Sequence, residues 1–289
     1  MVKAINSVIG QQYESWELIV VDDGSTDNTA QVVRAIDDER IRYVYQTNQE
    51  RCAARNNGID HATGKYICFL DSDDYYFPER LALLYQELER RSFPCQMFYT
   101  GLVIDMDNHT ARNEINETQA ANIFDHIATN IIHSQQVCIC SPILQQYKFD
   151  TRFRIAEDTE LWLRIAQKYP VSYLKGQFTV ALLHHDDRSV NLTRYNSGAG
   201  QLEIHRHILS GSHSGKRISA EVQLYMLADS YHAIARYHVH QHNRFTAAMA
   251  MLRALYTNIK SPWSKFRLHV FLKLVSFSGM EKVKKLIDS

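Results

Sequence analysis

Three clusters of acidic residues carry the chemistry that this sequence suggests. The first, Asp71-Ser72-Asp73-Asp74, places three carboxylates within four residues. Such carboxylates repel one another unless a cation neutralises them, and hard oxygen ligands suit Mg²⁺ or Mn²⁺. The alternative is a solvated acidic loop that caps the helix after Pro78, and the cluster alone does not decide between the two.

The second cluster, DDGSTD, runs from Asp22 to Asp27. Gly24 permits a tight turn, and a carboxylate beside it can accept a hydrogen bond from a nucleobase N–H or from ribose hydroxyls. The last three residues of the cluster are suited to cap the helix that follows. Asp22 and Asp23 come too early to do so, which leaves them available for a ligand.

The third cluster, Glu157-Asp158, opens a segment with amphipathic helical spacing that extends to Lys168. Acidic residues in the first turn of a helix interact favourably with its dipole. A carboxylate at a helix start that faces a cleft is also well placed to act as a general base. Both interpretations stay open on this pair alone.

The segments around these clusters alternate between strand and helix patterns. Two continuous apolar runs, Glu17–Val21 and Tyr66–Leu70, predict buried parallel strands, and each ends in acidic residues. The other segments are helices at 26–36, 52–61 and 78–91 and an alternating strand at 41–45. This order predicts a doubly wound α/β sheet, in which ligands bind at the carboxyl ends of the strands.

The rest of the chain changes character. A strand with a polar stretch is expected at 97–122 and a further strand at 171–185. Residues 218–259 have helical spacing without proline or glycine, which predicts an all-helical C-terminal part. We therefore expect a catalytic α/β domain over residues 1–195 and a helical region over residues 196–289.

Composition limits the partners. The 289 residues carry 32 Lys and Arg against 32 Asp and Glu, so the net charge is zero and does not suggest a nucleic-acid partner. No stretch predicts a signal peptide or approaches the ~20 apolar residues of a membrane span. The five cysteines are odd in number and scattered, which argues against a disulfide framework and favours a reducing cytoplasm.

The end of the chain is basic, because residues 260–289 carry seven Lys or Arg against two acids. Apolar residues recur in it at helical spacing, namely Trp263, Phe266, Val270, Leu274 and Phe277. A basic amphipathic helix of this kind can bind an anionic membrane, here the inner membrane surface. It can equally pack on the catalytic domain or on another subunit of a homo-oligomer.

Three motifs together resemble the large family of inverting family-2 glycosyltransferases with the GT-A fold. They are ELIVVDDGSTDNT at 17–29, CAARNNGIDHATGKYICFLDSDD at 52–74 and FDTRFRIAEDTELWLRIAQKYP at 149–170. Their order and spacing match that family. The resemblance implies transfer of a sugar, with inversion, from a nucleotide-sugar, usually a UDP-sugar, to a glycan or lipid-linked acceptor in cell-surface polysaccharide synthesis.

The resemblance assigns residues to the nucleotide. Asp23 would contact the base, usually uracil, with Asp22 beside it. Arg55 and Asn56 would line the nucleotide side of the pocket.

It also assigns residues to the diphosphate and its metal. Asp71 and Ser72 would lie near the ribose and diphosphate, and Asp73, with Asp71 as a neighbour, would hold Mn²⁺ or Mg²⁺. His185 or Arg188 would reach the diphosphate from a loop, although an exposed polar turn is the alternative for that segment.

The base would be Asp158, with Glu157 supporting it. An acceptor hydroxyl is a poor nucleophile and needs a base as it attacks the anomeric carbon. A divalent ion acts as a Lewis acid that stabilises the departing diphosphate. One metal carboxylate and one base carboxylate are the minimum set, and the sequence supplies both.

The sequence departs from the family at its start. Met1 falls inside the usual first helix, here Val2–Gln11, so the apolar first strand is missing and we expect an incomplete N-terminus. A non-catalytic, nucleotide-binding remnant is the alternative from another class. A metal-dependent nucleotidyltransferase is the rival enzyme, but it would show a glycine-rich, basic phosphate loop near its start, and we find none.

Overall fold

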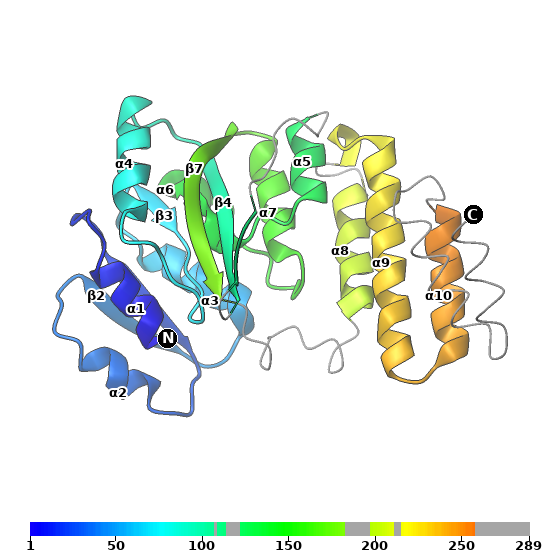
Figure 1. Ribbon diagram of the computed structural model, residues 1–289, viewed down its shortest axis with the longest axis horizontal. Helices are drawn as coiled ribbons and strands as arrows, with labels where there is room; N and C mark the ends of the chain where they lie inside the picture. The colour runs from blue at the N-terminus through cyan, green and yellow to red at the C-terminus, as the bar shows by residue number, and fades with distance from the viewer. Residues whose placement is uncertain (107–108, 114–121, 183–196, 211–214, 258–289) are drawn as a thin grey trace. The chain divides into compact units, whose positions relative to one another are not determined.

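The chain divides into two compact units, residues 1–185 and residues 186–289. The computed structural model describes all residues except 107–108, 114–121, 183–196, 211–214 and 258–289 (Figure 1). The domain boundary predicted at residue 195 lies outside the described residues. The apolar residues at 263–277, in the basic end of the chain, lie outside them as well. Their contact with a membrane or another subunit therefore stays a prediction, as does a cytoplasmic location.

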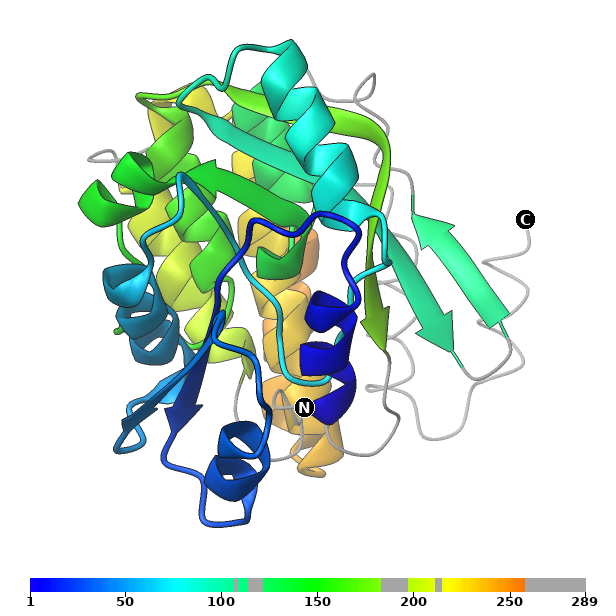
Figure 2. The same cartoon turned by 90° about the vertical axis from the view of Figure 1, so that its left-hand side faces the viewer.

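The first strands form a small parallel sheet. Its elements are β1 (Leu18–Asp23), α2 (Thr29–Arg34), β2 (Ile41–Gln46) and α3 (Glu50–His61). β1 and β2 run side by side, and α3 packs on β1 (Figure 2). The parallel register sets Asp23 opposite Gln46, so both side chains lie at the carboxyl end of the sheet.

A second sheet forms the centre of the first unit. Its strands are β3 (Tyr66–Cys68), β4 (Met97–Met106), β5 (His109–Asn113), β6 (Val137–Cys140) and β7 (Val171–Leu182). They lie in the order β3-β6-β4-β5, with antiparallel pairing, while β7 pairs with β4 in parallel. The mixed α/β prediction is confirmed. The prediction of one continuous sheet is corrected, because β1 and β3 belong to different sheets in the described part of the chain.

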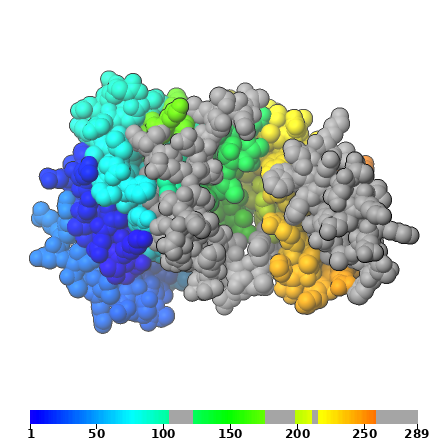
Figure 3. Space-filling model, viewed as in Figure 1, coloured from blue at the N-terminus to red at the C-terminus, as the bar shows by residue number. Residues whose placement is uncertain are grey.

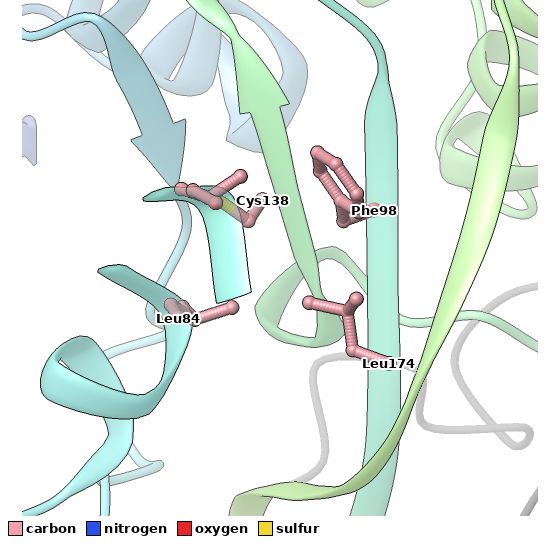
Figure 4. Close-up of a cluster of buried hydrophobic side chains, with 5 residues drawn as sticks. Leu84, Phe98, Cys138 and Leu174 are labelled. Atoms are coloured by element: carbon pink, nitrogen blue, oxygen red, sulfur yellow. The ribbon is translucent and has the colours of Figure 1, made fainter. Parts of the chain in front are cut away.

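Helices surround these strands. They are α1 (Val2–Ile9), α4 (Arg80–Arg90), α5 (Ile123–Thr129), α6 (Ser141–Gln146) and α7 (Glu157–Ala166), together with a 3₁₀ turn at Ser134–Gln136. Leu84 of α4 packs against Phe98, Cys138 and Leu174 from three neighbouring strands (Figure 4). Burial of such side chains contributes about 1.5–3 kcal/mol each, which holds α4 on the sheet.

The segment that follows the acidic loop is fastened to α1. The buried Gln11 amide donates to the carbonyl of Phe77 at 2.7 Å and accepts from the backbone N–H of Leu81 at 2.9 Å. Ser7 of α1 accepts from the backbone N–H of Tyr76 at 3.1 Å. Figure 3 shows α1 (dark blue) on the surface beside this region (cyan). These bonds limit how far the end of the acidic loop can move.

One pair of cysteines corrects a prediction. Cys95 and Cys140 form a disulfide with their Cα atoms 5.1 Å apart, whereas we expected no disulfide framework. Cys95 precedes β4 and Cys140 ends β6, and these strands are neighbours in the sheet. Sheet pairing thus brings together two cysteines that lie 45 residues apart in the sequence.

The second unit is helical over its described residues, as predicted. It contains α8 (Ser197–Leu209), α9 (Ala220–His240) and α10 (Arg244–Thr257), and α9 packs against both of the others. No helix in the described part of the chain is both long and apolar enough to cross a membrane.

Gly198 allows α8 and α9 to approach closely. A Cβ atom at this position would lie 2.2 Å from the backbone nitrogen of Ile234 and 2.6 Å from the carbonyl carbon of Ala233. Backbone atoms cannot rotate away as a flexible side chain can, so any larger residue would force the two helices apart.

We expect Gly198→Ala to destabilise the helical unit by about 2 kcal/mol, as overpacked cores do. Urea denaturation followed by far-ultraviolet circular dichroism measures the change. Gly58→Ala is the matched control in α3, because its Cβ would meet a Val21 methyl at an ordinary 3.4 Å. An unfolding midpoint for Gly198→Ala equal to that of the wild type would contradict this packing.

Candidate functional site

The turn after β1 is held against the start of α3. Gly24 has a φ of +81°, and a Cβ there would lie 2.7 Å from the backbone nitrogen of Asn48. Only glycine fits both the left-handed conformation and this close approach. The turn therefore brings the end of β1 next to the loop that leads into α3.

Asp22 and Asp23 do different things in this turn. Asp22 is buried, and its two oxygens accept from the backbone N–H of Ser25 at 2.8 Å and from the Tyr43 hydroxyl at 2.5 Å. Burial opposes ionisation, but these hydrogen bonds outweigh it and lower the pKa of Asp22 below its usual value. These two bonds let Asp22 shape the turn, and a nucleotide contact by Asp22 or Asp23 stays a prediction.

Arg55 of α3 joins two of the three acidic clusters. Its guanidinium donates to Glu157 Oε1 at 3.1 Å and to Asp71 Oδ1 at 3.0 Å. The side chains of Arg55 and Glu157 are only 13% and 5% exposed, whereas Asp71 is 41% exposed. Burial alone would lower the pKa of Arg55, but the Asp71 and Glu157 carboxylates raise it. The ion pair fixes the acidic loop beside the start of α7.

Asn56, the next residue in α3, has a structural task. Its amide donates to the carbonyl of Phe149 and accepts from the N–H of the same residue, both at 2.9 Å. We expected Asn56 to line the nucleotide pocket. Both ends of the amide bond Phe149, so this side chain clamps the loop before α7 to α3. Its contact with a nucleotide stays a prediction.

An aromatic chain supports the same junction. Phe149 packs edge-on against Phe69 at 5.5 Å and against Trp162 at 5.8 Å between ring centroids. Phe69 lies just before the acidic loop, and the buried Trp162 lies in α7. Such contacts contribute about 0.5–1.5 kcal/mol each beyond the burial of their surface. They therefore help to hold together the elements that the Arg55 ion pairs join.

The third acidic pair, Glu157 and Asp158, lies at the start of α7, directly after a strained backbone position. Ala156, which precedes it, has a φ of 53°, a left-handed conformation that costs a non-glycine residue about 1 kcal/mol. Glu157 is buried, and Asp158 is half-buried, with its Oδ1 accepting from the backbone N–H of Thr159 at 2.7 Å. Burial and the neighbouring Glu157 carboxylate raise the pKa of Asp158 to about 7. A carboxylate with this pKa suits proton transfer near neutral pH.

The acidic loop is neither wholly solvated nor a helix cap. Asp74 is buried and accepts from the Gln135 amide at 2.7 Å, while α4 has Glu79 rather than Asp74 at its N-cap. Ser72 and Asp73 are exposed. The alternative of a solvated loop that caps this helix therefore does not hold for Asp74.

The exposed part of this loop fits a divalent ion that a donor would share. Asp71 and Asp73 offer hard oxygen ligands, and Mg²⁺ is commonly held by one or two carboxylates together with substrate phosphates. Among the described residues, no group of three or more His, Cys, Asp or Glu side chains is placed to hold a metal by itself. The protein would thus supply part of the coordination sphere and the donor the rest.

Sequence reasoning missed several residues of this site. Gln46 donates to Asp23, and Asn57 donates to Gln46. Gln135 donates to Asp74, and Phe149 contacts both Arg55 and Asn56. None of these lies in an acidic cluster, so their spacing gave no signal. The predicted His185 and Arg188 lie outside the described residues.

Comparison of the sequence with known proteins identifies a family of glycosyltransferases. The family model described as Glycosyl transferase family 2 matches residues 1–162. An uncharacterized glycosyltransferase of Rickettsia felis is 32% identical over 180 residues, which are 58% of this chain but only 28% of that protein. The putative colanic acid biosynthesis glycosyl transferase WcaA of Escherichia coli is 29% identical over 206 residues, 66% of this chain and 70% of that protein.

Solved structures share the fold. TarS of S. aureus in complex with UDP-GlcNAc superposes with a TM-score of 0.60 at 16% identity, over 89% of this chain and 84% of that one. The mannosyltransferase PcManGT of Pyrobaculum calidifontis, in complex with GDP-Man and Mn²⁺, gives 0.52 at 17% identity, over 99% and 79%. The GT-A architecture expected from the sequence is thereby confirmed.

We expect Arg55→Met to destabilise the first unit by about 2 kcal/mol, because it leaves the buried Glu157 carboxylate without its closest cation. Arg51, whose Nη1 lies 3.6 Å from Glu157, limits the loss. Urea denaturation followed by tryptophan fluorescence measures it. Arg51→Met is the matched control and should cost less than about 1 kcal/mol, since that side chain is 35% exposed. Equal effects of the two substitutions would show that Arg55 is not the central partner.

Proposed function

Since the chain belongs to glycosyl transferase family 2, we propose that it transfers a sugar from a nucleotide-sugar donor to a glycan or lipid-linked acceptor with inversion. The observation that carries the proposal is the Arg55 bridge, which holds the acidic loop and the start of α7 in one place. A transferase needs these two functions together, one at the leaving group and one at the attacking hydroxyl.

The comparisons support two parts of the proposal, the nucleotide-sugar donor and the polysaccharide product. TarS is described in complex with UDP and with UDP-GlcNAc, and PcManGT with GDP-Man and Mn²⁺. WcaA and the Bacillus subtilis protein TuaG bear names of colanic acid and teichuronic acid biosynthesis. We extend these to the present chain as a UDP-sugar donor and a cell-surface polysaccharide product.

The residues divide the reaction between them. Asp158 takes the proton of the acceptor hydroxyl as the new oxygen–carbon bond forms at the anomeric carbon. The bond from that carbon to the phosphate oxygen breaks, and the electron pair leaves with the nucleoside diphosphate. Attack from the face opposite the leaving group inverts the anomeric centre. A bound divalent ion would supply charge stabilisation to the departing diphosphate.

Glu157 and Arg55 act on these groups indirectly. Burial of Asp158 is the larger cause of its raised pKa, and the negative charge of Glu157 is the second. Glu157 therefore makes Asp158 a stronger base. The Arg55 guanidinium is occupied by Glu157 and Asp71. We therefore assign it the positioning of both clusters rather than direct binding of the nucleotide.

We expect Asp158→Asn to lower turnover by ~10²–10⁴ while donor binding stays near the wild-type value, because only the base is lost. In the wild type, kcat/KM should rise as the pH increases through about 7, since the base must be deprotonated, and the variant should lose this rise. Hydrolysis of UDP-sugars with Mn²⁺ provides the assay.

Asp60→Asn is the control for Asp158→Asn, because Asp60 is an exposed carboxylate of α3 paired with Lys148. Turnover that survives in Asp158→Asn would show that another residue is the base. Nucleotide binding without any turnover in the wild type would instead identify a non-catalytic remnant.

We expect Asp73→Ala to lower Mn²⁺-dependent UDP affinity about tenfold or more, because an exposed metal carboxylate is removed. Calorimetric titration of UDP at increasing Mn²⁺ measures the effect. Asp37→Ala removes another exposed carboxylate and should leave the titration unchanged. UDP affinity in Asp73→Ala that still increases with Mn²⁺ as in the wild type would refute the metal assignment.

A further inference from the structure

A chain of side-chain amides ends at Asp23. Asn57 of α3 donates from Nδ2 to Gln46 Oε1 at 2.7 Å, and Gln46 donates from Nε2 to Asp23 Oδ1 at 2.7 Å. The three residues come from α3, β2 and β1. Gln46 lies opposite Asp23 in the register, at the carboxyl end of the small sheet, where ligands of such sheets bind.

The direction of these hydrogen bonds is fixed by chemistry. A carboxylate accepts hydrogen bonds and cannot donate, whereas an amide can turn either its oxygen or its NH₂ toward a neighbour. Asn57 donates to the Gln46 oxygen, and this leaves the Gln46 NH₂ facing Asp23. The Asp23 carboxylate thus sets the orientation of Gln46, and Asn57 stabilises that orientation by donating to the Gln46 oxygen.

The Asp23 carboxylate is held by one of its two oxygens. Oδ1 accepts from Gln46 and also from the backbone N–H of Gln49 at 2.8 Å, at the start of α3. No hydrogen bond to Oδ2 comes from the residues that the structure describes. Two donors on one oxygen restrict rotation of the carboxylate, so Oδ2 becomes an acceptor with a set direction.

We infer that Gln46 and Asn57 are positioning residues that make Asp23 selective for nucleobases with an imino N–H. The inference rests on the proposed nucleotide-sugar activity and deepens it. Uracil and guanine carry an imino N–H that can donate to Oδ2, whereas the corresponding ring nitrogen of cytosine is an acceptor and is repelled. A site with a fixed polar group rejects bases that leave this group unpaired.

Asn57→Asp tests the inference with almost no change in size. Aspartate at position 57 can only accept, so it would compete with Asp23 for the Gln46 NH₂. Where it wins, the Gln46 oxygen turns toward Asp23. We expect UDP and GDP to bind about tenfold more weakly to Asn57→Asp, because a hydrogen bond is replaced by a contact between acceptors. The preference for UDP over CDP should fall by a similar factor. Asn57→Ala removes the donor without reversing the amide and should have a smaller effect on both.

The measurement is calorimetric titration of UDP, GDP and CDP into the full chain with Mn²⁺. Asn122→Asp is the matched control, because it adds the same charge at the N-cap of α5, where aspartate caps as well as asparagine. It should leave the UDP-to-CDP ratio of the wild type intact. In turnover assays, Asn57→Asp should raise the donor KM with little change in kcat.

Two results would overturn the inference in distinguishable ways. An unchanged UDP-to-CDP ratio in Asn57→Asp, with a wild type that binds UDP, would refute the role of Gln46 and Asn57 alone. Absence of nucleotide binding by the wild type would refute the proposed function, and the inference with it. A general loss of affinity that leaves the ratio unchanged would point to a structural effect and count against selectivity.

Discussion

The site depends on one largely buried guanidinium, that of Arg55, which two carboxylates distant in sequence share. Arg55 lies 16 residues before Asp71 and 102 residues before Glu157 in the chain. Loss of this cation from the buried Glu157 carboxylate would cost about 2 kcal/mol, so the pairing favours the arrangement in which both acidic elements lie beside Arg55. The same ion pair that stabilises the unit therefore brings together the two acidic elements to which we assign the reaction.

Helix α3 is the element that transmits this constraint. The backbone N–H of its N-cap residue, Gln49, donates to Asp23, and its middle carries Arg55. Asn56 bonds the loop before α7, and Asn57 bonds the end of β2. A helix of 12 residues thus links Asp23, the acidic loop and the start of α7, to which we assign the nucleobase contact, the diphosphate and the general base. This arrangement does not require β1 and β3 to belong to one sheet.

The pattern of apolar residues along the sequence predicted which acidic residues lie at the ends of strands and helices. Asp23 and Asp71 follow apolar strands, and Asp158 opens an amphipathic helix, so hydrophobic periodicity places them at element ends. The roles of Gln46 and Asn57 depend on strand register and on the direction of side-chain amides, which periodicity does not specify. The division into two sheets and the Cys95–Cys140 disulfide were missed for a related reason, since both depend on which strands become neighbours.

The charges around Arg55 explain why the site would need a cation from outside the protein. Asp71 and Glu157 are paired with Arg55, and Arg51 adds a weaker contact to Glu157. Among the described residues, no ion pair reaches Asp73 or Asp158. A nucleoside diphosphate would bring further negative charge to the same place, and like charges at such distances repel strongly in a partly buried site. We infer that Asp73 and Asp158, which have no ion pair among the described residues, divide the remaining work, Asp73 with a metal ion and Asp158 with a proton.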